Sequence, residues 1–218
     1  GFNGSLDTGL TAGHYVRYNA STNMNYKTGK VNFFGNYGYN GGDNFNFGFV
    51  DRPGNDILQD FQFVNENQSH LVKAGADIYL NKKNTLSFYT TQNFFNGGGN
   101  GRTIITQNNA ITSNAKNIQL QKNVTGTYNV NYKVDFEKKG HNLEFEANYS
   151  TTDSPEDATN SDAVSPNDME LNYFNDIEND RNNTLVNIDY TNPVSDDGKL
   201  ELGLEYRANN TSNINLTN

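Results

Sequence analysis

Residues 128–150 read YNVNYKVDFEKKGHNLEFEANYS, and this stretch decides the fold of the chain. Apolar and polar side chains alternate from Tyr128 to Phe136 and again from Leu143 to Ser150, with the polar run 137–142 between them. Alternation with a period of two is typical of β-strands, because successive side chains point to opposite faces of a sheet. The stretch therefore predicts two antiparallel strands joined by a turn.

The alternation also predicts how the two strands pair. A register that collects every apolar side chain on one face is favoured, because a slip by one residue would mix the two faces. The pairs expected on this basis are Phe136–Leu143, Val134–Phe145, Tyr132–Ala147, Val130–Tyr149, Lys133–Glu146, Asn131–Asn148 and Asp135–Glu144. The polar face carries charges, which favours water on that face and lipid or a core on the other.

The same pattern recurs along the chain and predicts further hairpins. Short turns are expected at 27–30, 81–84, 137–142 and 195–199, and long polar connections at 41–68, 96–123 and 151–180. In the first hairpin the apolar faces meet if Tyr26 lies opposite Val31 and Tyr18 opposite Tyr39. Short turns on one side and long loops on the other are typical of outer-membrane barrels. The predicted fold is all-β, an antiparallel up-and-down transmembrane β-barrel with about nine strands of a larger barrel, in a single segment over residues 1–218.

Composition supports a barrel and excludes several other classes. The net charge of −9 disfavours nucleic acid as a partner, and the chain has no cysteine. It has 13 Tyr and 14 Phe, too many aromatic residues for a typical disordered chain. Clean alternation over about 10 residues matches the length that a tilted strand needs to cross a bilayer. Two aromatic belts are expected, formed by Tyr18, Tyr39, Tyr149 and Tyr206 on the long-loop side and Tyr26, Tyr79, Tyr190 and Phe136 on the short-turn side.

Three pieces of the sequence resemble a known family. YKTGKVNFFGNY at 26–37, GADIYLNKKNTLS at 75–87 and the region of Tyr206 resemble the barrel part of outer-membrane proteins of Bacteroidetes that are related to TonB-dependent receptors. The resemblance implies a barrel of about 22 strands, closed around a separate plug domain. It also implies uptake of scarce nutrients with energy from an inner-membrane complex. The chain shows no plug and no energy-coupling box, so we expect it to be a segment of a longer chain.

The resemblance and the strand pattern together set the functional expectations. The location implied is the bacterial outer membrane. The partners implied are outer-membrane lipid, a plug domain, the rest of the barrel in the same chain and a surface lipoprotein. The expected function is solute uptake. The alternative is a surface or secreted β-sheet protein of adhesin type with no transport role, whose apolar face would pack on a second sheet. Strict alternation of short turns and long connections favours the barrel over such a sandwich.

The sequence offers little evidence for catalysis. His14, His70 and His141 lack the spacing of metal ligands, and the glycine-rich stretch 97–102 lacks the Lys-Ser/Thr ending of a phosphate loop. We therefore expect no enzyme activity, no catalytic residues, no metal site and no cofactor. Residues 151–180 contain nine acidic residues and no basic one, but lack the regular spacing of a calcium loop, so a solvated loop is favoured over calcium binding.

The polar rows of the later strands are the candidate functional residues. They would face the barrel lumen, either lining a solute path or packing on a plug, although each one is also compatible with a merely solvated sheet face. The candidates are Asn129, Asn131, Lys133, Asp135, Glu144, Glu146, Asn187, Asp189, Glu201, Glu205 and Arg207. The predicted register places Asp135 opposite Glu144 and Asp189 opposite Glu201, two like-charge pairs that would need nearby cations. The aromatic residues of the first long connection either extend the strands or contact a ligand or partner: Phe45, Phe47, Phe49, Phe61 and Phe63.

Overall fold

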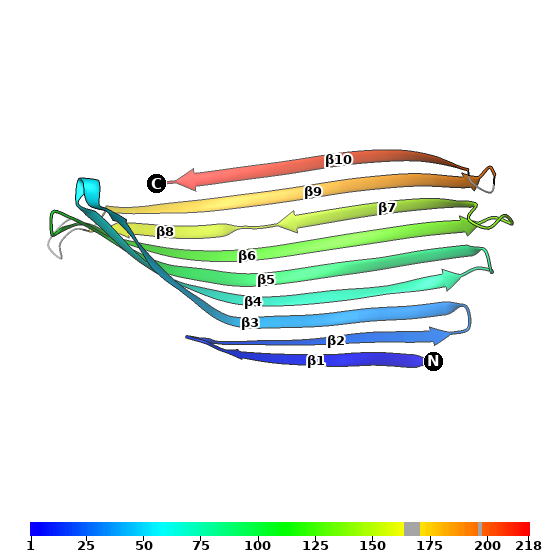
Figure 1. The fold of residues 1–218 in the computed structure, drawn as a ribbon, viewed down its shortest axis with the longest axis horizontal. Helices are drawn as coiled ribbons and strands as arrows, with labels where there is room; N and C mark the ends of the chain where they lie inside the picture. Colours follow the sequence, from blue (N-terminus) through cyan, green and yellow to red (C-terminus); the bar gives the residue numbers. More distant parts are fainter. Residues whose placement is uncertain (164–170, 196–197) are drawn as a thin grey trace.

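The chain forms one large antiparallel sheet (Figure 1), here described from a computed structural model that covers residues 1–163, 171–195 and 198–218. Its elements are β1 (Phe2–Ala12), β2 (Val16–Thr28), β3 (Val31–Arg52), the 3-10 turn η1 (Pro53–Asn55), β4 (Ile57–Tyr79), β5 (Asn84–Gln107), β6 (Ala110–Asp135), β7 (Asn142–Asp153), β8 (Glu156–Asp162), β9 (Leu171–Pro193) and β10 (Lys199–Thr217). Consecutive strands lie side by side with one exception: β8 does not pair with β7 but continues it, between β6 and β9. The up-and-down antiparallel order expected from the sequence is confirmed.

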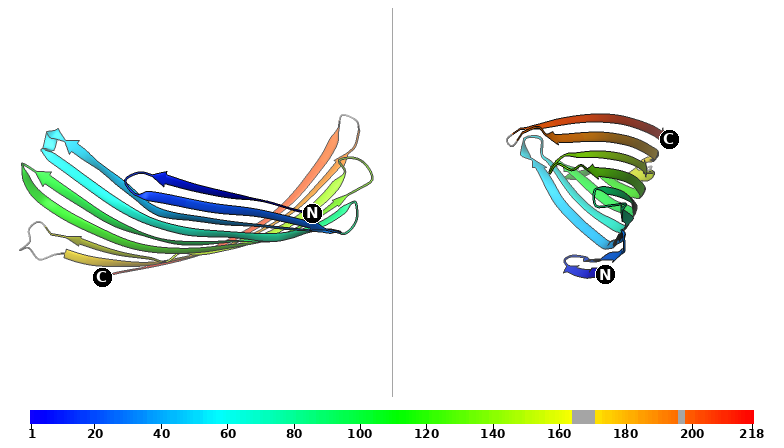
Figure 2. Two further views of the ribbon diagram at one scale, coloured as in Figure 1. Left: turned by 90° about the horizontal axis from the view of Figure 1, so that it is seen from below. Right: turned by 90° about the vertical axis from the view of Figure 1, so that its right-hand side faces the viewer.

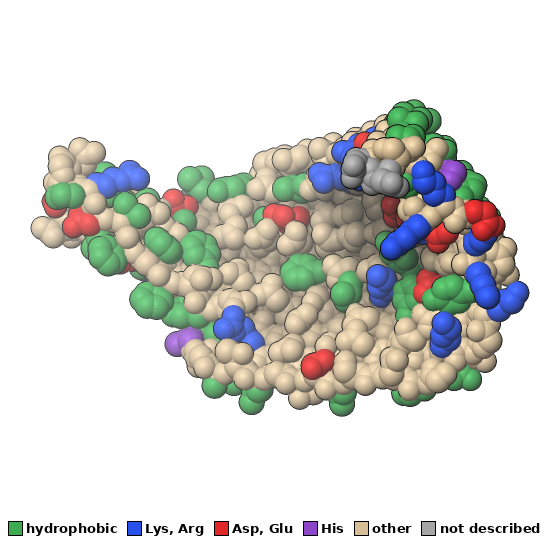
Figure 3. All heavy atoms as spheres, turned by 45° about the vertical axis from the view of Figure 1, so that its right-hand side comes forward, with side chains coloured by type: hydrophobic (Ala, Val, Ile, Leu, Met, Phe, Trp, Pro, Cys, Tyr) green, Lys and Arg blue, Asp and Glu red, His purple; other side chains and the backbone are tan. Residues whose placement is uncertain are grey.

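The sheet curls into an open trough (Figure 2). In β6 the polar positions are the more covered ones: Asn129 is 3% exposed, whereas its neighbours Tyr128 and Val130 are 50% and 44% exposed. Side chains on the inside of a curved sheet crowd one another, while those on the outside spread apart. The apolar rows therefore lie on the convex face. Figure 3 shows the hollowed face lined mainly by backbone and uncharged polar atoms, with hydrophobic side chains along its margins.

The sheet has almost no hydrophobic core of its own. Only Ala76 and Ala158 are buried apolar residues in the part of the chain that the structure describes. The accessible surface is 14546 Å², whereas a compact soluble monomer of this size would have about 10,000 Å². Large hydrophobic side chains cover the convex face instead, and exposed apolar surface on this scale marks a face that contacts something else. No helix among the described residues is long and apolar enough to span a bilayer.

The predicted faces are correct, but the predicted register of three hairpins, β2–β3, β6–β7 and β9–β10, is wrong by two residues. Val134 pairs with Leu143 and Tyr128 with Tyr149, so Asp135 lies opposite Asn142. The Tyr128 and Tyr149 rings stack with centroids 6.5 Å apart. A two-residue slip keeps every side chain on its face, so alternation alone cannot detect it. Cross-strand pairs and the turn decide instead: both registers place Lys133 opposite a glutamate, but the observed one avoids the like-charge pair of Asp135 with Glu144.

The first hairpin shows the same shift. Thr28 pairs with Val31, so Tyr26 faces Phe33 and Tyr18 faces Gly41. Gly29 has φ +56°, a left-handed conformation that closes a tight turn of only two residues. The expected pairing of Tyr26 with Val31 assumed a longer turn.

The regions predicted as long connections are largely strand. Most of 41–68 belongs to β3 and β4, joined by the short turn around η1, and 96–123 belongs to β5 and β6, joined at 108–109. Positive φ angles of Asn108 and Asn109 close that second turn. The acidic stretch 151–180 contains the end of β7, all of β8 and the start of β9; residues 164–170 lie outside the described part of the chain. Glycine- and asparagine-rich sequence has low strand propensity, and pairing with a neighbour overrides it here.

The short-turn side agrees more closely with expectation. The structure has turns at 29–30, 80–83 and 136–141, while residues 196–197 of the last turn lie outside the described residues. Of the expected belt residues, Tyr79 is misplaced. It lies on the concave face, where the Lys27 ammonium is 4.6 Å from its ring centroid. The reason is parity: Tyr79 falls on the odd-numbered positions of β4, which share a face with Asp77.

Candidate functional site on the concave face

All the candidate residues predicted on the later strands lie on the concave face. The ladder pairs them across β6, β7, β9 and β10 in four neighbouring rows. The rows are Asn129–Asn148–Leu185–Arg207, Asn131–Glu146–Asn187–Glu205, Lys133–Glu144–Asp189–Gly203 and Asp135–Asn142–Thr191–Glu201. The prediction placed these residues on the correct face but named the wrong partners.

Amide groups hold the carboxylates of these rows in place. Asn129 donates to Glu146 Oε1 at 2.7 Å and to Asn148 Oδ1 at 2.6 Å, and Asn131 donates to Glu144 Oε1 at 2.6 Å. Asn187 Oδ1 is buried without a hydrogen-bond partner in the described structure. A hydrogen-bonded carboxylate is fixed in direction, so these rows form an ordered acidic wall rather than a set of freely moving side chains.

The predicted like-charge pairs are not present. Asp135 lies opposite Asn142 and Asp189 opposite Gly203, because of the two-residue register shift. A different like-charge pair replaces them, since Glu144 lies opposite Asp189 on β9. Lys133 lies on the other side of Glu144, in the same row, and supplies the nearest opposite charge along the ladder. Farther along β10, Lys199 and Glu201 form an exposed ion pair at 2.8 Å, and Arg207 and Glu205 form another at 3.0 Å.

A second cluster on the concave face of β1 to β5 was not predicted. The Lys73 ammonium lies 4.4 Å from the Tyr89 ring centroid and 5.9 Å from that of Phe34. A cation over aromatic faces is stabilised by the ring quadrupoles. No ion pair found among the described residues includes Lys73. Alternate positions on the early strands are also polar, and this pattern could have indicated the cluster. The expected lumen-facing residues came from the later strands only.

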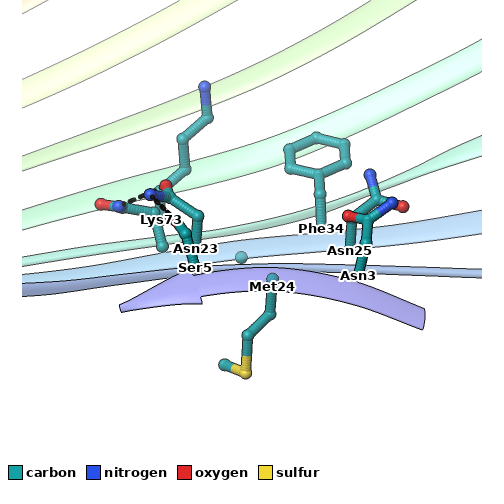
Figure 4. Close-up of a pocket in the computed structure, with 10 residues that line it drawn as sticks. Asn3, Ser5, Asn23, Met24, Asn25, Phe34 and Lys73 are labelled. Atoms are coloured by element: carbon teal, nitrogen blue, oxygen red, sulfur yellow. Dashed lines mark hydrogen bonds between the residues drawn. The ribbon is translucent and has the colours of Figure 1, made fainter. Parts of the chain in front are cut away.

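Lys73 belongs to a hollow between the first four strands (Figure 4). The hollow has a volume of about 500 Å³ and is lined by Asn3, Ser5, Asn23, Asn25, Phe34 and Lys73, among others. These labelled side chains point to one side of the sheet, whereas Met24 points to the other. Asn36 donates to Asn23 Oδ1 at 2.8 Å, and Asn23 donates to Ser5 Oγ at 3.3 Å. The hollow therefore combines ordered amides with one cation and an aromatic face.

Glycines make room for the concave-face aromatic rings. A Cβ on Gly75 would lie 2.5 Å from Phe34 Cζ and 2.6 Å from Tyr89 Cβ. A Cβ on Gly101 would likewise lie too close to the Phe63 ring, and a Cβ on Gly48 too close to the Phe61 ring. In each case the ring covers a glycine directly opposite it in the ladder. Such pairs let bulky rings lie flat against the wall and leave the trough open.

The structure does not gather the residues considered for catalysis or metal binding. His70 Nδ1 lies 2.8 Å from Tyr37 Oη, His141 Nε2 lies 3.0 Å from Tyr190 Oη, and the His14 ring stacks on Phe45. The glycine-rich stretch 97–102 is part of β5. Among residues 1–163, 171–195 and 198–218, no three His, Asp or Glu side chains are grouped to hold a metal ion. Asp168 and Glu170 of the acidic stretch lie outside the described residues.

Comparison with known proteins agrees with this architecture. The model of the Outer membrane protein beta-barrel family matches residues 134–218, from the end of β6 through β10. No curated protein sequence matches the chain.

Two solved structures superimpose on most of the sheet at low sequence identity. The RagAB peptide importer in its closed-closed state superimposes with a TM-score of 0.50 at 10% identity, over 93% of this chain and 31% of that chain. FpvA of P. aeruginosa, solved with heterologous pyoverdines and iron, gives a TM-score of 0.48 at 9% identity, over 99% of this chain and 36% of that chain. The chain thus spans about a third of the length of these structures.

The order of the strands, the two-faced sheet and the family match lead to one assignment. The described residues form an all-β, up-and-down antiparallel sheet, residues 134–218 match the model of the Outer membrane protein beta-barrel family, and both findings point to the bacterial outer membrane.

Proposed function

We propose that the chain forms part of the wall of a barrel that takes up a solute across the outer membrane. The observation that carries the proposal is the division of the sheet into an apolar convex face and an ordered polar concave face. In this arrangement the convex face contacts lipid and the concave face contacts water, a plug domain or the solute. Outer-membrane barrels have short turns in the periplasm and long projections outside, so β3–β4 and β5–β6 would extend beyond the outer surface.

The charges on the concave face suggest how the wall would be used. The acidic rows on β6 to β10 lie toward the short turns, where a plug of the same full-length chain would dock through basic groups. The hollow around Lys73 supplies amides, a cation and aromatic faces, which suit a polar solute that carries negative charge. A surface lipoprotein would cover the outer opening. This role requires no catalytic group.

Uptake can be measured in cells that carry or lack the full-length gene. The probes are a labelled peptide mixture and a ferric pyoverdine, which correspond to the peptide importer and the pyoverdine complex described above. We expect deletion to reduce accumulation of one probe at least tenfold, complementation to restore it, and Lys73→Gln to restore it only in part. Unchanged accumulation of both probes in the deletion strain would contradict uptake of these cargo types and favour a surface-binding role.

A further inference from the structure

Beyond Gly42, β3 has no partner strand on the side away from β4, although β3 is not a marginal strand of the sheet. β2 pairs with β3 only as far as Arg17 and Gly42, because the β1–β2 hairpin turns back at 13–15. β3 continues to Arg52 with β4 on one side only. Residues 43–52, which we name the open edge, therefore have no strand on the side away from β4 in the described structure. The β3–β4 hairpin projects past the shorter β1–β2 hairpin in Figures 1 and 2.

Gly42 marks the point where β3 separates from β2. It has φ +126°, and a Cβ there would lie 2.5 Å from Val16 O. Only glycine adopts this conformation without strain while lying so close to the end of the neighbouring strand. Arg17 Nη1 donates to Asn44 Oδ1 at 3.0 Å, and the His14 ring stacks on Phe45 at 4.4 Å. The tip of the β1–β2 hairpin thus covers the beginning of the open edge and leaves the rest free.

The hydrogen-bond pattern identifies which backbone groups are free. Tyr79 N donates to Lys30 O, and the β3–β4 register continues without a shift to Arg52. Residues of an antiparallel strand alternately direct both backbone groups to one neighbour and then to the other. Even-numbered residues of β3 therefore bond to β4. The N–H and C=O groups that point to the open edge belong to Asp43, Phe45, Phe47, Phe49 and Asp51.

Side chains beside these groups are apolar and acidic. Phe47 and Phe49 are 74% and 70% exposed on the convex face. Asp43, Asp51, Asp60 and Glu66 lie on the same face of the hairpin, whereas Arg52 is the only basic residue between 43 and 66. Natural sheets usually protect such an edge with lysine, proline or a bulge. Residues 43–51 have none of these devices: they contain no lysine or proline, and their pairing with β4 is regular.

We propose that the open edge of β3 binds an extended cationic peptide as an added β-strand. Alternating backbone donors and acceptors specify an extended backbone, as in other cases of strand addition. The exposed rings of Phe47 and Phe49 contact apolar side chains of the peptide, and the four carboxylates favour lysine or arginine in it. In the orientation proposed above, the open edge lies beyond the outer surface of the membrane, so a peptide outside the cell reaches it. The proposal does not depend on uptake, because binding at the edge requires no passage through the barrel.

The test compares two substitutions at one position in the full-length protein in detergent. Phe47→Ala removes the ring and keeps the backbone N–H, whereas Phe47→Pro removes both. Proline is tolerated at an edge where the N–H faces solvent, so both variants should fold, and heat-modifiable gel migration checks this. The probe is a fluorescent peptide of alternating Val and Thr with Lys at both ends, measured by anisotropy. We expect Phe47→Ala to weaken binding several-fold and Phe47→Pro at least tenfold more than Phe47→Ala.

Three results would overturn the proposal. Equal binding to the Phe47→Pro and Phe47→Ala variants would show that the backbone of the edge is not used. Absence of binding to the wild type up to about 1 mM peptide, the weak end of specific recognition, would reject the site. A wild-type dimer that Phe47→Pro converts to a monomer, measured by sedimentation, would show that the edge pairs with a second copy of the chain instead.

Discussion

At the scale of single residues, the concave wall depends on glycines that lie under aromatic rings. Gly75 is the clearest case, because Phe34 and Tyr89 approach it from both neighbouring strands. A methyl group there would displace rings that also flank Lys73. The position of the Lys73 ammonium therefore depends on the absence of a side chain at Gly75.

This link predicts that Gly75→Ala destabilises the barrel. Overpacking of this kind typically costs about 1–3 kcal/mol. Gly38→Ala is the matched control, because its nearest neighbour would be Leu71 Cβ at 3.8 Å, an ordinary contact on the same face. Urea unfolding of the full-length variants in lipid vesicles measures both. An equal effect of the two substitutions would contradict the proposed role of the rings.

Asn129 leads to a second prediction at this scale. Its side chain is almost fully buried and donates to both Glu146 and Asn148. Asn129→Ala removes both donors and leaves a carboxylate and an amide oxygen without them, which should cost about 1–3 kcal/mol of unfolding free energy. Asn3→Ala is the control, since Asn3 is exposed and no side-chain hydrogen bond is found for it among the described residues. If the two variants unfold alike, the amide network does not stabilise the wall.

At the scale of strands, the sequence predicts faces well and registers poorly. Alternation from Tyr128 to Phe136 correctly assigned Asn129, Asn131 and Lys133 to the polar face. It could not decide between registers two residues apart, because both keep the same faces. The observed register stacks Tyr128 on Tyr149 and places Asp135 opposite Asn142 instead of Glu144, and only the folded hairpin shows these contacts.

Strand length was the second feature that the sequence left undetermined. Glycine and asparagine in 41–68 and 96–123 indicated loops, yet β3 to β6 run through these regions. The alternation of Phe45, Phe47 and Phe49 was the usable signal, and extension of the strand is the alternative that the structure supports. The hollow around Lys73 was missed for a different reason. Its residues come from four strands, and no local pattern brings them together.

The two faces of β6 predict opposite responses to an added charge. Val130→Lys places an ammonium on the convex face, which should cost about 2–4 kcal/mol if that face lies at the middle of a bilayer. Thr127→Lys places the same group on the concave face and should change stability little, because water reaches that side. Unfolding in vesicles measures the difference. Similar costs at both positions would contradict a lipid-facing convex surface.

At the scale of the whole molecule, the sheet is a wall without a core. Its accessible surface of 14546 Å² and its exposed convex side chains require a surrounding that buries them. Its margins β1 and β10 do not pair with each other in the described residues, so the trough is open on its long sides. A bilayer around the convex face and further strands at both margins would satisfy these requirements together.

The most direct test of this account maps the surroundings of β6 in the full-length protein in membranes. The chain has no cysteine, so one introduced cysteine at each position from 124 to 134 carries a spin label at a known site. Collisions with oxygen report lipid, and collisions with a water-soluble nickel chelate report water. We expect a period of two, with even positions accessible to oxygen and odd positions shielded from lipid. Even positions that are as accessible to the nickel chelate as to oxygen would place the convex face in water and contradict the account.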